Sequence, residues 1–495
     1  MLFNSFDFAF FFPVVIVIYF ILPSKIRYIW LLVSSYFFYM NWNIKYVLVL
    51  VLITLVSYVS ARNIQTIRDR QDKKEKKLRG GAKVFILNGI VCLGVLAIFK
   101  YANFIIYNIN LIFRQADLKT FDIVLPIGIS FYTFQAIGYV TDVYKGTTRA
   151  EKNVFKYALF VSFFPQLIAG PIERSNNLLL QINENKKFDY YKARDGVYLM
   201  IWGYFIKMVV ADRIAIFVDA VYADIITYSG WYLIVATILF AFQVYCDFAG
   251  YSIIAMGSAK IMGFELMDNF DAPYTSSSIG EFWRRWHISL SSWFRDYLYI
   301  PLGGNRKGII RKYANLMLVF MVSGLWHGAS WNYVIWGGLN GFYQVIGDLK
   351  DKYIKRINNI DVVERKNGEK NIGFHILLTF LLVDFSWIFF RAESVGKSFE
   401  ILKSVKNANN IHILFDGTLS SSVLSHKGFM LMIWGIITVI VVDLLKRNRI
   451  CVRDWIQKQG YITRLFVVTI SVVIIFVYGI YGAAYDATSF IYFQF

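Results

Sequence analysis

The sequence that decides the fold is EFWRRWHISLSSWFRDYLYIPLGGNRKG at residues 281–308, followed by VSGLWHGASW at residues 322–331. These two segments place two of the chain's five histidines, His287 and His327, among tryptophans and charged residues. An ionisable side chain held within an apolar, lipid-embedded chain costs free energy, so such a residue indicates a functional site. We therefore take both histidines as candidate catalytic residues.

The composition is that of a membrane protein. Hydrophobic residues make up 57% of the 495 positions and charged residues 17%, whereas a soluble globular protein carries about 25% charged residues. The net charge of +19 is divided into short basic runs between apolar segments, as expected for cytoplasmic loops. This pattern excludes a soluble globule and favours orientation in a lipid bilayer over nucleic-acid binding.

The apolar segments predict an all-α polytopic membrane protein with about eleven or twelve spanning helices. Residues 1–23 are interpreted as a retained first span, because they are too long for a signal peptide and have neither a basic start nor a small-residue cleavage site. The basic loop at residues 62–83 is expected in the cytoplasm, which places the N-terminus outside. We expect one membrane-embedded domain over residues 1–495, divided into N-terminal helices (1–120), a catalytic core with re-entrant elements (121–350) and C-terminal helices (351–495).

The segment FFPQLIAGPIER at residues 163–174 interrupts an apolar run. Three apolar runs lie between two loops that are both expected in the cytoplasm, so one run does not span, and Pro165, Gly170 and Pro171 break the helix here. Non-helical backbone at membrane depth is tolerated only where protein or a water-filled cavity covers it. We predict a re-entrant element that lines a cavity with these three residues and Gln166. A proline-kinked ordinary helix is the alternative.

Asp247 lies in an apolar segment that continues with several small residues, including Gly250 and Gly257. Only about fourteen positions follow Gly250, which is short of the roughly 20 residues of a spanning helix. The small residues indicate close helix packing. Two interpretations of Asp247 stay open: a helix-end residue at the membrane interface, or a buried residue with a partner.

Five motifs carry a resemblance to a known family: FFPQLIAGPIER, FWRRWHISLSSWFRDYLYIPLGGNR, GLWHGASW, FFRAES and FIYFQF. They resemble the membrane-bound O-acyltransferase (MBOAT) family, and in particular its alginate O-acetyltransferase branch. The resemblance implies the MBOAT fold, with helices around a central cavity, and transfer of an acyl group from a thioester to a hydroxyl. It implies that His327, in the GLWHG element, is catalytic and that His287 is the second functional position.

The resemblance also implies partners. In the alginate branch, acetyl passes through the membrane to a secreted or membrane-anchored acetyltransferase that works with polysaccharide machinery. A related branch, which D-alanylates teichoic acid, takes its acyl group from a carrier protein. For this chain we expect acetyl-CoA as the acyl donor, no permanently bound cofactor and no metal, because a thioester is already activated and no His, Cys and carboxylate cluster has metal-ligand spacing.

Elementary histidine chemistry agrees with this role. The pKa of free histidine is near 6.5 and desolvation lowers it, so a buried ring is neutral at pH 7 and accepts a proton from an attacking hydroxyl. We expect His327 to be the general base and His287 to position the substrate or polarise its carbonyl. Ion pairing with Glu281 and Asp296 is the alternative role of the nearby arginines. The candidate substrate- or donor-binding residues are Trp283, Arg284, Arg285, Arg295, Asp296, Asn305 and Trp326.

The predicted function is a membrane O-acyltransferase that moves an acyl group, acetyl from acetyl-CoA, for O-acetylation of an extracellular or cell-wall polysaccharide at the cell membrane. Two alternatives are D-alanyl transfer to teichoic acid and a non-enzymatic polysaccharide or acyl transporter. A transporter would show internal repeats and broken helices in matching halves. The sequence has broken segments but no matching halves.

Overall fold

The computed structural model describes residues 1–70, 79–113, 117–168, 170–358 and 371–481. This described part is helical and contains no strand. Contacts divide the chain into two compact units. Unit 1 comprises Met1–Gly203 and Tyr251–Asp268, and unit 2 comprises Tyr204–Gly250 and Asn269–Phe495. The predicted division near residues 120 and 350 stays a prediction.

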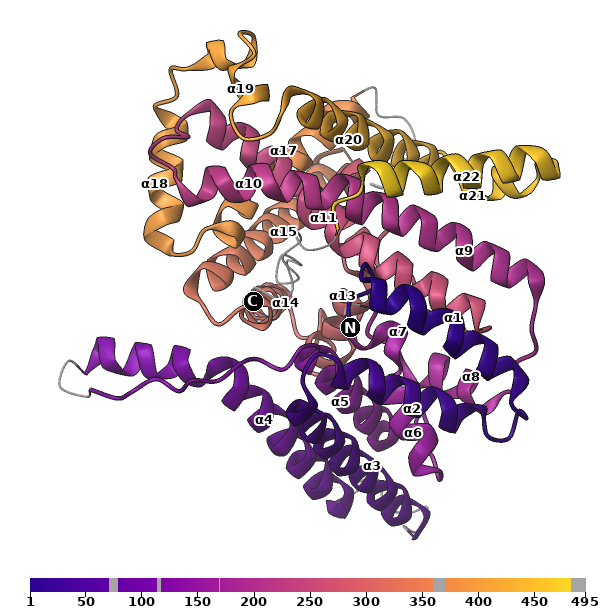
Figure 1. Ribbon diagram of the computed structural model, residues 1–495. Helices are drawn as coiled ribbons and strands as arrows, with labels where there is room; N and C mark the ends of the chain where they lie inside the picture. The colour runs from indigo at the N-terminus through magenta and orange to yellow at the C-terminus, as the bar shows by residue number, and fades with distance from the viewer. Residues whose placement is uncertain (71–78, 114–116, 169, 359–370, 482–495) are drawn as a thin grey trace. The chain divides into compact units, whose positions relative to one another are not determined.

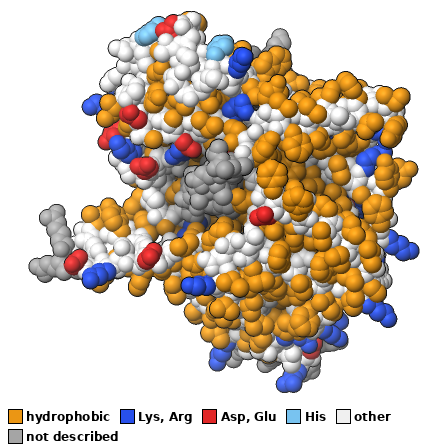
Figure 2. All heavy atoms as spheres, viewed as in Figure 1, with side chains coloured by type: hydrophobic (Ala, Val, Ile, Leu, Met, Phe, Trp, Pro, Cys, Tyr) orange, Lys and Arg blue, Asp and Glu red, His pale blue; other side chains and the backbone are white. Residues whose placement is uncertain are grey.

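Seven helices of the described part are long and apolar enough to cross a membrane. Hydrophobic side chains also cover much of the molecular face in Figure 2. The chain is therefore an all-α polytopic membrane protein. The candidate spans are Ile44–Arg70, Gly80–Ile112, Trp231–Ile261, Ile309–His327, Ile372–Arg391, His426–Arg447 and Tyr461–Tyr478.

The predicted eleven or twelve spans exceed these seven, because several apolar runs fold as helices too short to span a bilayer of about 30 Å when straight. The expected first span is one of them: α1 has 16 residues (Phe6–Ile21). The other short helices are α2 (Arg27–Met40), α5 (Ile129–Lys145) and α6 (Val154–Ser162). Helix α9 (Tyr190–Tyr204) instead continues without a break through η3 (Phe205–Ala211) into α10 (Asp212–Ala223).

Unit 1 contains α1, α2, α5, α6, most of α9 and two long helices, α3 and α4, that lie side by side (Figure 1). Side-chain caps set several helix starts: the Ser5 hydroxyl accepts the Phe8 N–H at 3.2 Å, and Asn153 accepts the first N–H groups of α6. The remaining elements are η1 (Ile44–Tyr46), α3 (Val47–Arg70), α4 (Arg79–Ile112), α7 (Phe164–Leu167), η2 (Ser175–Leu179) and α8 (Leu180–Asn183).

The FFPQLIAGPIER segment breaks the helix, as predicted. Helix α6 ends at Ser162, α7 is a single turn with Pro165 in its first positions, and residues 170–174 are not helical. Residues 163–168 and 170–173 are buried, and the Gln166 amide donates to the Phe160 carbonyl oxygen at 2.8 Å and to Gln135 Oε1 at 3.1 Å. Protein therefore covers this irregular backbone, and the alternative of one continuous kinked helix is wrong. A re-entrant path and a cavity lining stay predictions.

The 31-residue helix α11 (Trp231–Ile261) runs through Gly250 without a break. Asp247 is consequently in a helix interior and 2% exposed, and its carboxylate lies 2.5 Å from Lys207 Nζ. Of the two interpretations of Asp247, the buried and partnered one is confirmed. Close packing of the small residues is also confirmed in unit 1, where a Cβ at Gly257 would meet the backbone of Gly196.

Unit 2 contains the first part of α11, up to Gly250, and the remaining helices. Helices α14 (Ile309–His327) and α15 (Trp331–Asn358) pack closely, because Gly324 contacts the Tyr333 carbonyl and Gly337 contacts the Phe320 carbonyl, where a Cβ would collide. The other elements are η3 (Phe205–Ala211), α10 (Asp212–Ala223), η4 (Pro273–Thr275), α12 (Ile279–Arg285), α13 (Ile288–Phe294), η5 (Arg295–Tyr299), α17 (Ile372–Arg391), α18 (Val395–Lys406), η6 (Ile411–Leu414), α19 (Thr418–Ser421), α20 (His426–Arg447), α21 (Val452–Gln457) and α22 (Tyr461–Tyr478).

Replacing Gly337 with alanine is expected to force α14 and α15 apart and to destabilise the protein by about 1–3 kcal/mol, the usual cost of overpacking. Gly338 is the matched control, because nothing lies within 4 Å of a Cβ built there. Thermal unfolding in detergent should show a lower midpoint for Gly337→Ala and no loss for Gly338→Ala. Equal midpoints for the two variants would contradict the close approach.

A buried cation lies between two carboxylates in unit 2. Lys207 Nζ is 2.6 Å from Asp212 Oδ1 and 2.5 Å from Asp247 Oδ1, and all three side chains are at most 4% exposed. Lys207→Met would leave two carboxylates without this cation, and removing one partner of a buried ion pair costs about 3–5 kcal/mol.

The matched control is Lys192→Met, which removes the exposed Lys192–Glu265 pair and is expected to cost at most about 1 kcal/mol. Thermal unfolding and membrane abundance compare the two variants. Similar decreases in the thermal midpoint of Lys207→Met and Lys192→Met would show that the buried ion pairs stabilise the protein no more than the exposed pair does.

Candidate active site

His287 lies between α12 and α13 in a left-handed backbone conformation, with φ 44° and ψ 55°. A residue with a Cβ pays roughly 1–2 kcal/mol for this conformation, so other contacts must hold it. Asn269 provides them. Its backbone oxygen accepts the Ile288 N–H at 2.9 Å, and its side-chain oxygen accepts the Ser289 N–H at 3.3 Å and the Ser289 hydroxyl at 2.8 Å.

The same Asn269 Oδ1 is 3.1 Å from His287 Nδ1. This atom accepts a backbone N–H, so it is the amide oxygen rather than the amide nitrogen. An oxygen acceptor places the proton of the neutral imidazole on Nδ1 and leaves Nε2 as an acceptor. The His287 side chain is 0% exposed, and burial lowers its pKa from 6.5 to about 3. The ring is therefore neutral at physiological pH.

His327 is the last residue of α14 and is 4% exposed. Its ring lies against aromatic side chains, with centroid distances of 5.1 Å to Trp336 and 5.5 Å to Phe390. The rings of His287 and His327 are 6.3 Å apart, centroid to centroid. Tertiary structure thus brings the two predicted histidines into one buried aromatic site within unit 2.

Both predicted tryptophans belong to this site. The Trp326 ring is 4.8 Å from His327 and 6.0 Å from His287. Trp283 packs at 5.7 Å against Trp336, and its Nε1–H donates to Asn340 Oδ1 at 3.3 Å. The Asn340 amide in turn donates to the Trp336 carbonyl oxygen at 2.9 Å and to the Ser386 hydroxyl at 3.1 Å.

Sequence reasoning missed Asn269 and Asn340, which hold the histidine and the tryptophans in place. Asn340 had a usable signal, because a polar amide within the helical run GLNGF needs a partner. Asn269 had none, since it lies in a loop and its partners follow from tertiary structure alone. Phe390 was quoted within FFRAES but was not assigned to the site.

Some of the charged residues predicted for the site form ion pairs, and others are exposed. Arg285 Nη2 is 3.0 Å from Glu281 Oε1, and Arg295 Nε is 2.8 Å from Asp296 Oδ1. These two arginines form the ion pairs that the alternative interpretation expected, and a role in donor binding stays a prediction. Arg284 and Asn305 are exposed.

The four residues predicted to line a cavity, Pro165, Gln166, Gly170 and Pro171, are buried and belong to unit 1, so their role stays a prediction.

Residues 150–372 match the family described as MBOAT, membrane-bound O-acyltransferase family. The chain is 38% identical over 402 residues to a probable alginate O-acetylase, AlgI, of Pseudomonas putida, covering 80% of this chain and 78% of the relative. It is 32% identical over 454 residues to a peptidoglycan O-acetyltransferase of Helicobacter pylori, covering 83% and 81%. Identity to a teichoic acid D-alanyltransferase of Streptococcus thermophilus is 28% over 291 residues, covering 53% and 68%.

The lowered pKa of His287 predicts a loss of stability in acid. Between about pH 6.5 and pH 3 the unfolded chain binds a proton at this ring and the folded chain does not, so the free energy of unfolding falls as pH falls. At about 1.36 kcal/mol per pH unit, the loss between pH 7 and pH 5 is about 2 kcal/mol. His287→Gln removes the titrating ring, so its thermal midpoint should fall less over this range than that of the unmodified protein.

His412, which is exposed, provides the control, and His412→Gln should follow the unmodified protein. Identical pH dependence of the unmodified protein and His287→Gln would show that His287 is not held neutral.

Proposed function

Because the chain belongs to the membrane-bound O-acyltransferase family, we propose that it takes acetyl from acetyl-CoA and supplies it for O-acetylation of an extracellular or cell-wall polysaccharide. The chain is a multi-pass membrane O-acyltransferase. Because the members of this family are acyltransferases, family membership supports an enzyme rather than a non-enzymatic transporter. Acetyl is favoured over D-alanyl, since the two acetyl-transferring relatives align over about four-fifths of the chain and the D-alanyltransferase over 53%.

The observation that carries the proposal is the meeting of two histidines from separate motifs in one buried site. In the proposed reaction, His327 accepts the proton of the acceptor hydroxyl as its oxygen attacks the thioester carbonyl. The new C–O bond forms, the C–S bond breaks, and the proton passes to the departing thiolate. The carbonyl end of a helix carries partial negative charge. His327 at the end of α14 is therefore well placed to hold the positive charge that develops on its ring.

His287 has a different proposed role. With Nδ1–H donating to Asn269, its Nε2 has no proton to donate in the neutral ring, so it does not polarise a carbonyl. An acceptor nitrogen can instead receive a hydrogen bond from the substrate hydroxyl and hold it for His327. This favours positioning, the first of the two roles expected for His287.

The proposal extends to location and partners. Basic loops in the cytoplasm place the N-terminus outside the cell membrane. Acetyl leaving the membrane would be passed to a secreted or membrane-anchored acetyltransferase that acts with the polysaccharide machinery. A carrier-protein donor belongs to the D-alanyl alternative.

His327→Ala is expected to reduce O-acetyl on the surface polysaccharide by at least about 100-fold, since a general base contributes 10²- to 10⁴-fold. His426→Ala removes an exposed histidine and should leave acetylation unchanged. Acetyl and ester-linked D-alanine are measured on the same polymer samples, and membrane abundance is measured for each variant.

Unchanged acetylation in His327→Ala at equal abundance would refute the base assignment. A loss of D-alanine with unchanged acetyl would identify the alternative reaction.

A further inference from the structure

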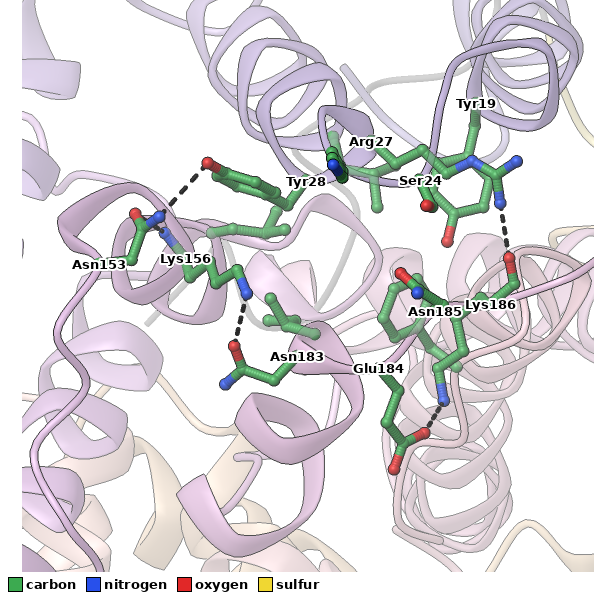
Figure 3. Close-up of a pocket in the computed structure, with 15 residues that line it drawn as sticks. Tyr19, Ser24, Arg27, Tyr28, Asn153, Lys156, Asn183, Glu184, Asn185 and Lys186 are labelled. Atoms are coloured by element: carbon green, nitrogen blue, oxygen red, sulfur yellow. Dashed lines mark hydrogen bonds and ion pairs between the residues drawn. The ribbon is translucent and has the colours of Figure 1, made fainter.

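Unit 1 contains a polar pocket of about 340 Å³ that the proposed reaction does not use (Figure 3). Three segments distant in sequence line it: the turn between α1 and α2, the start of α6, and the chain after α8. Phe264 completes the wall. The polar lining residues are Tyr19, Ser24, Lys25, Arg27, Tyr28, Asn153, Lys156, Asn183, Glu184, Asn185 and Lys186.

The pocket carries excess positive charge. Four lining residues are cationic and one, Glu184, is acidic, which leaves a formal charge of +3. Glu184 pairs with Lys186 at 2.7 Å. The Glu184 carboxylate is thus already engaged by Lys186.

Arg27 is held by neutral groups. Its guanidinium donates to the carbonyl oxygens of Lys186 at 2.5 Å, Leu22 at 2.8 Å and Phe20 at 3.1 Å. Lys156 Nζ likewise donates to the amide oxygen of Asn183 at 2.7 Å. These partners fix both cations in position without cancelling their charge. Fixed cations bind an anion at a smaller entropic cost than mobile ones.

Aromatic rings also support the cations. Arg27 lies 5.3 Å from the ring centroid of Tyr19, Lys156 lies 5.5 Å from that of Tyr28, and Lys186 lies 5.6 Å from that of Phe264. Within the pocket, the hydroxyl of Ser24 and the amide of Asn185 are additional hydrogen-bond donors (Figure 3). Cations combined with neutral donors are the groups that bind phosphate oxygens.

Exposed apolar side chains lie close in the sequence to residues that line the pocket. Ile21 is 75% exposed, Ile26 43%, Phe155 55% and Phe188 58%, and each lies within two residues of a lining residue in the sequence. A soluble phosphate compound would gain nothing from contact with these four apolar side chains, which we call the apolar rim. The acyl chains of a phospholipid would cover them. Basic pockets beside membrane helices bind lipid headgroups in this way.

We propose that this pocket binds the phosphate headgroup of an anionic phospholipid, of the phosphatidylglycerol or cardiolipin class. The phosphate is held by Lys25, Arg27 and Lys156, and the acyl chains lie against the apolar rim. The site is independent of the proposed acetyl transfer.

Delipidated full-length protein in detergent is titrated with phosphatidylglycerol, and bound lipid is measured by native mass spectrometry. Lys25→Gln/Lys156→Gln is expected to weaken binding at least about tenfold, and Lys25→Arg/Lys156→Arg should restore it. The control Lys350→Gln/Lys458→Gln removes two exposed lysines elsewhere and should bind like the unmodified protein. An unchanged thermal midpoint without lipid shows that each variant folds.

Phosphatidylcholine and 3′,5′-adenosine diphosphate serve as further probes. The proposal expects phosphatidylcholine to bind at least tenfold more weakly than phosphatidylglycerol, and the soluble diphosphate not to displace the lipid. Equal binding of phosphatidylglycerol by the Gln/Gln variant and the control would overturn the site. Displacement of the lipid by the diphosphate would show that the pocket binds a soluble phosphate compound rather than a phospholipid.

Discussion

Every polar group that this chain carries into a bilayer must find its partner within the protein, because the hydrocarbon interior offers no water. In unit 1, this constraint accounts for the buried turn at residues 163–168, where the Gln166 amide donates to the Phe160 carbonyl and to Gln135. In unit 2, it accounts for Lys207, whose charge lies against two buried carboxylates. In each case the fold provides a local set of partners where the backbone or a charge would otherwise be unsatisfied.

The histidine site is built by the same rule. The side-chain oxygen of Asn269 accepts hydrogen bonds from His287 and Ser289. The backbone oxygen of Asn269 accepts the N–H of Ile288, which lies between these two residues in the chain. These bonds hold a left-handed turn that would be costly on its own. Asn340 connects Trp283 to Trp336 in the same way. The bond from Asn269 Oδ1 to His287 Nδ1 fixes the orientation of the His287 ring.

The basic pocket of unit 1 differs from these closed sets. Its cations are positioned by carbonyl and amide oxygens, which satisfy hydrogen bonds but leave net charge. Burying unpaired charge is costly, but a pocket open to solvent can use its excess charge to attract an anion. The groups around the histidines are mainly neutral amides and aromatic rings, whereas the pocket lining carries a net charge of +3.

The sequence by itself determined the membrane class, the family motifs, the two candidate histidines and the helix break within FFPQLIAGPIER. These features depend on composition, on residue order within a motif and on local backbone chemistry. Only the tertiary structure decided that Asp247 is paired with Lys207, that α11 continues past Gly250, and that Asn269 sets the orientation and tautomer of His287. A local pattern records hydrophobicity and helix breakers. The partner of a polar group is chosen by the packing of segments that are far apart in the chain.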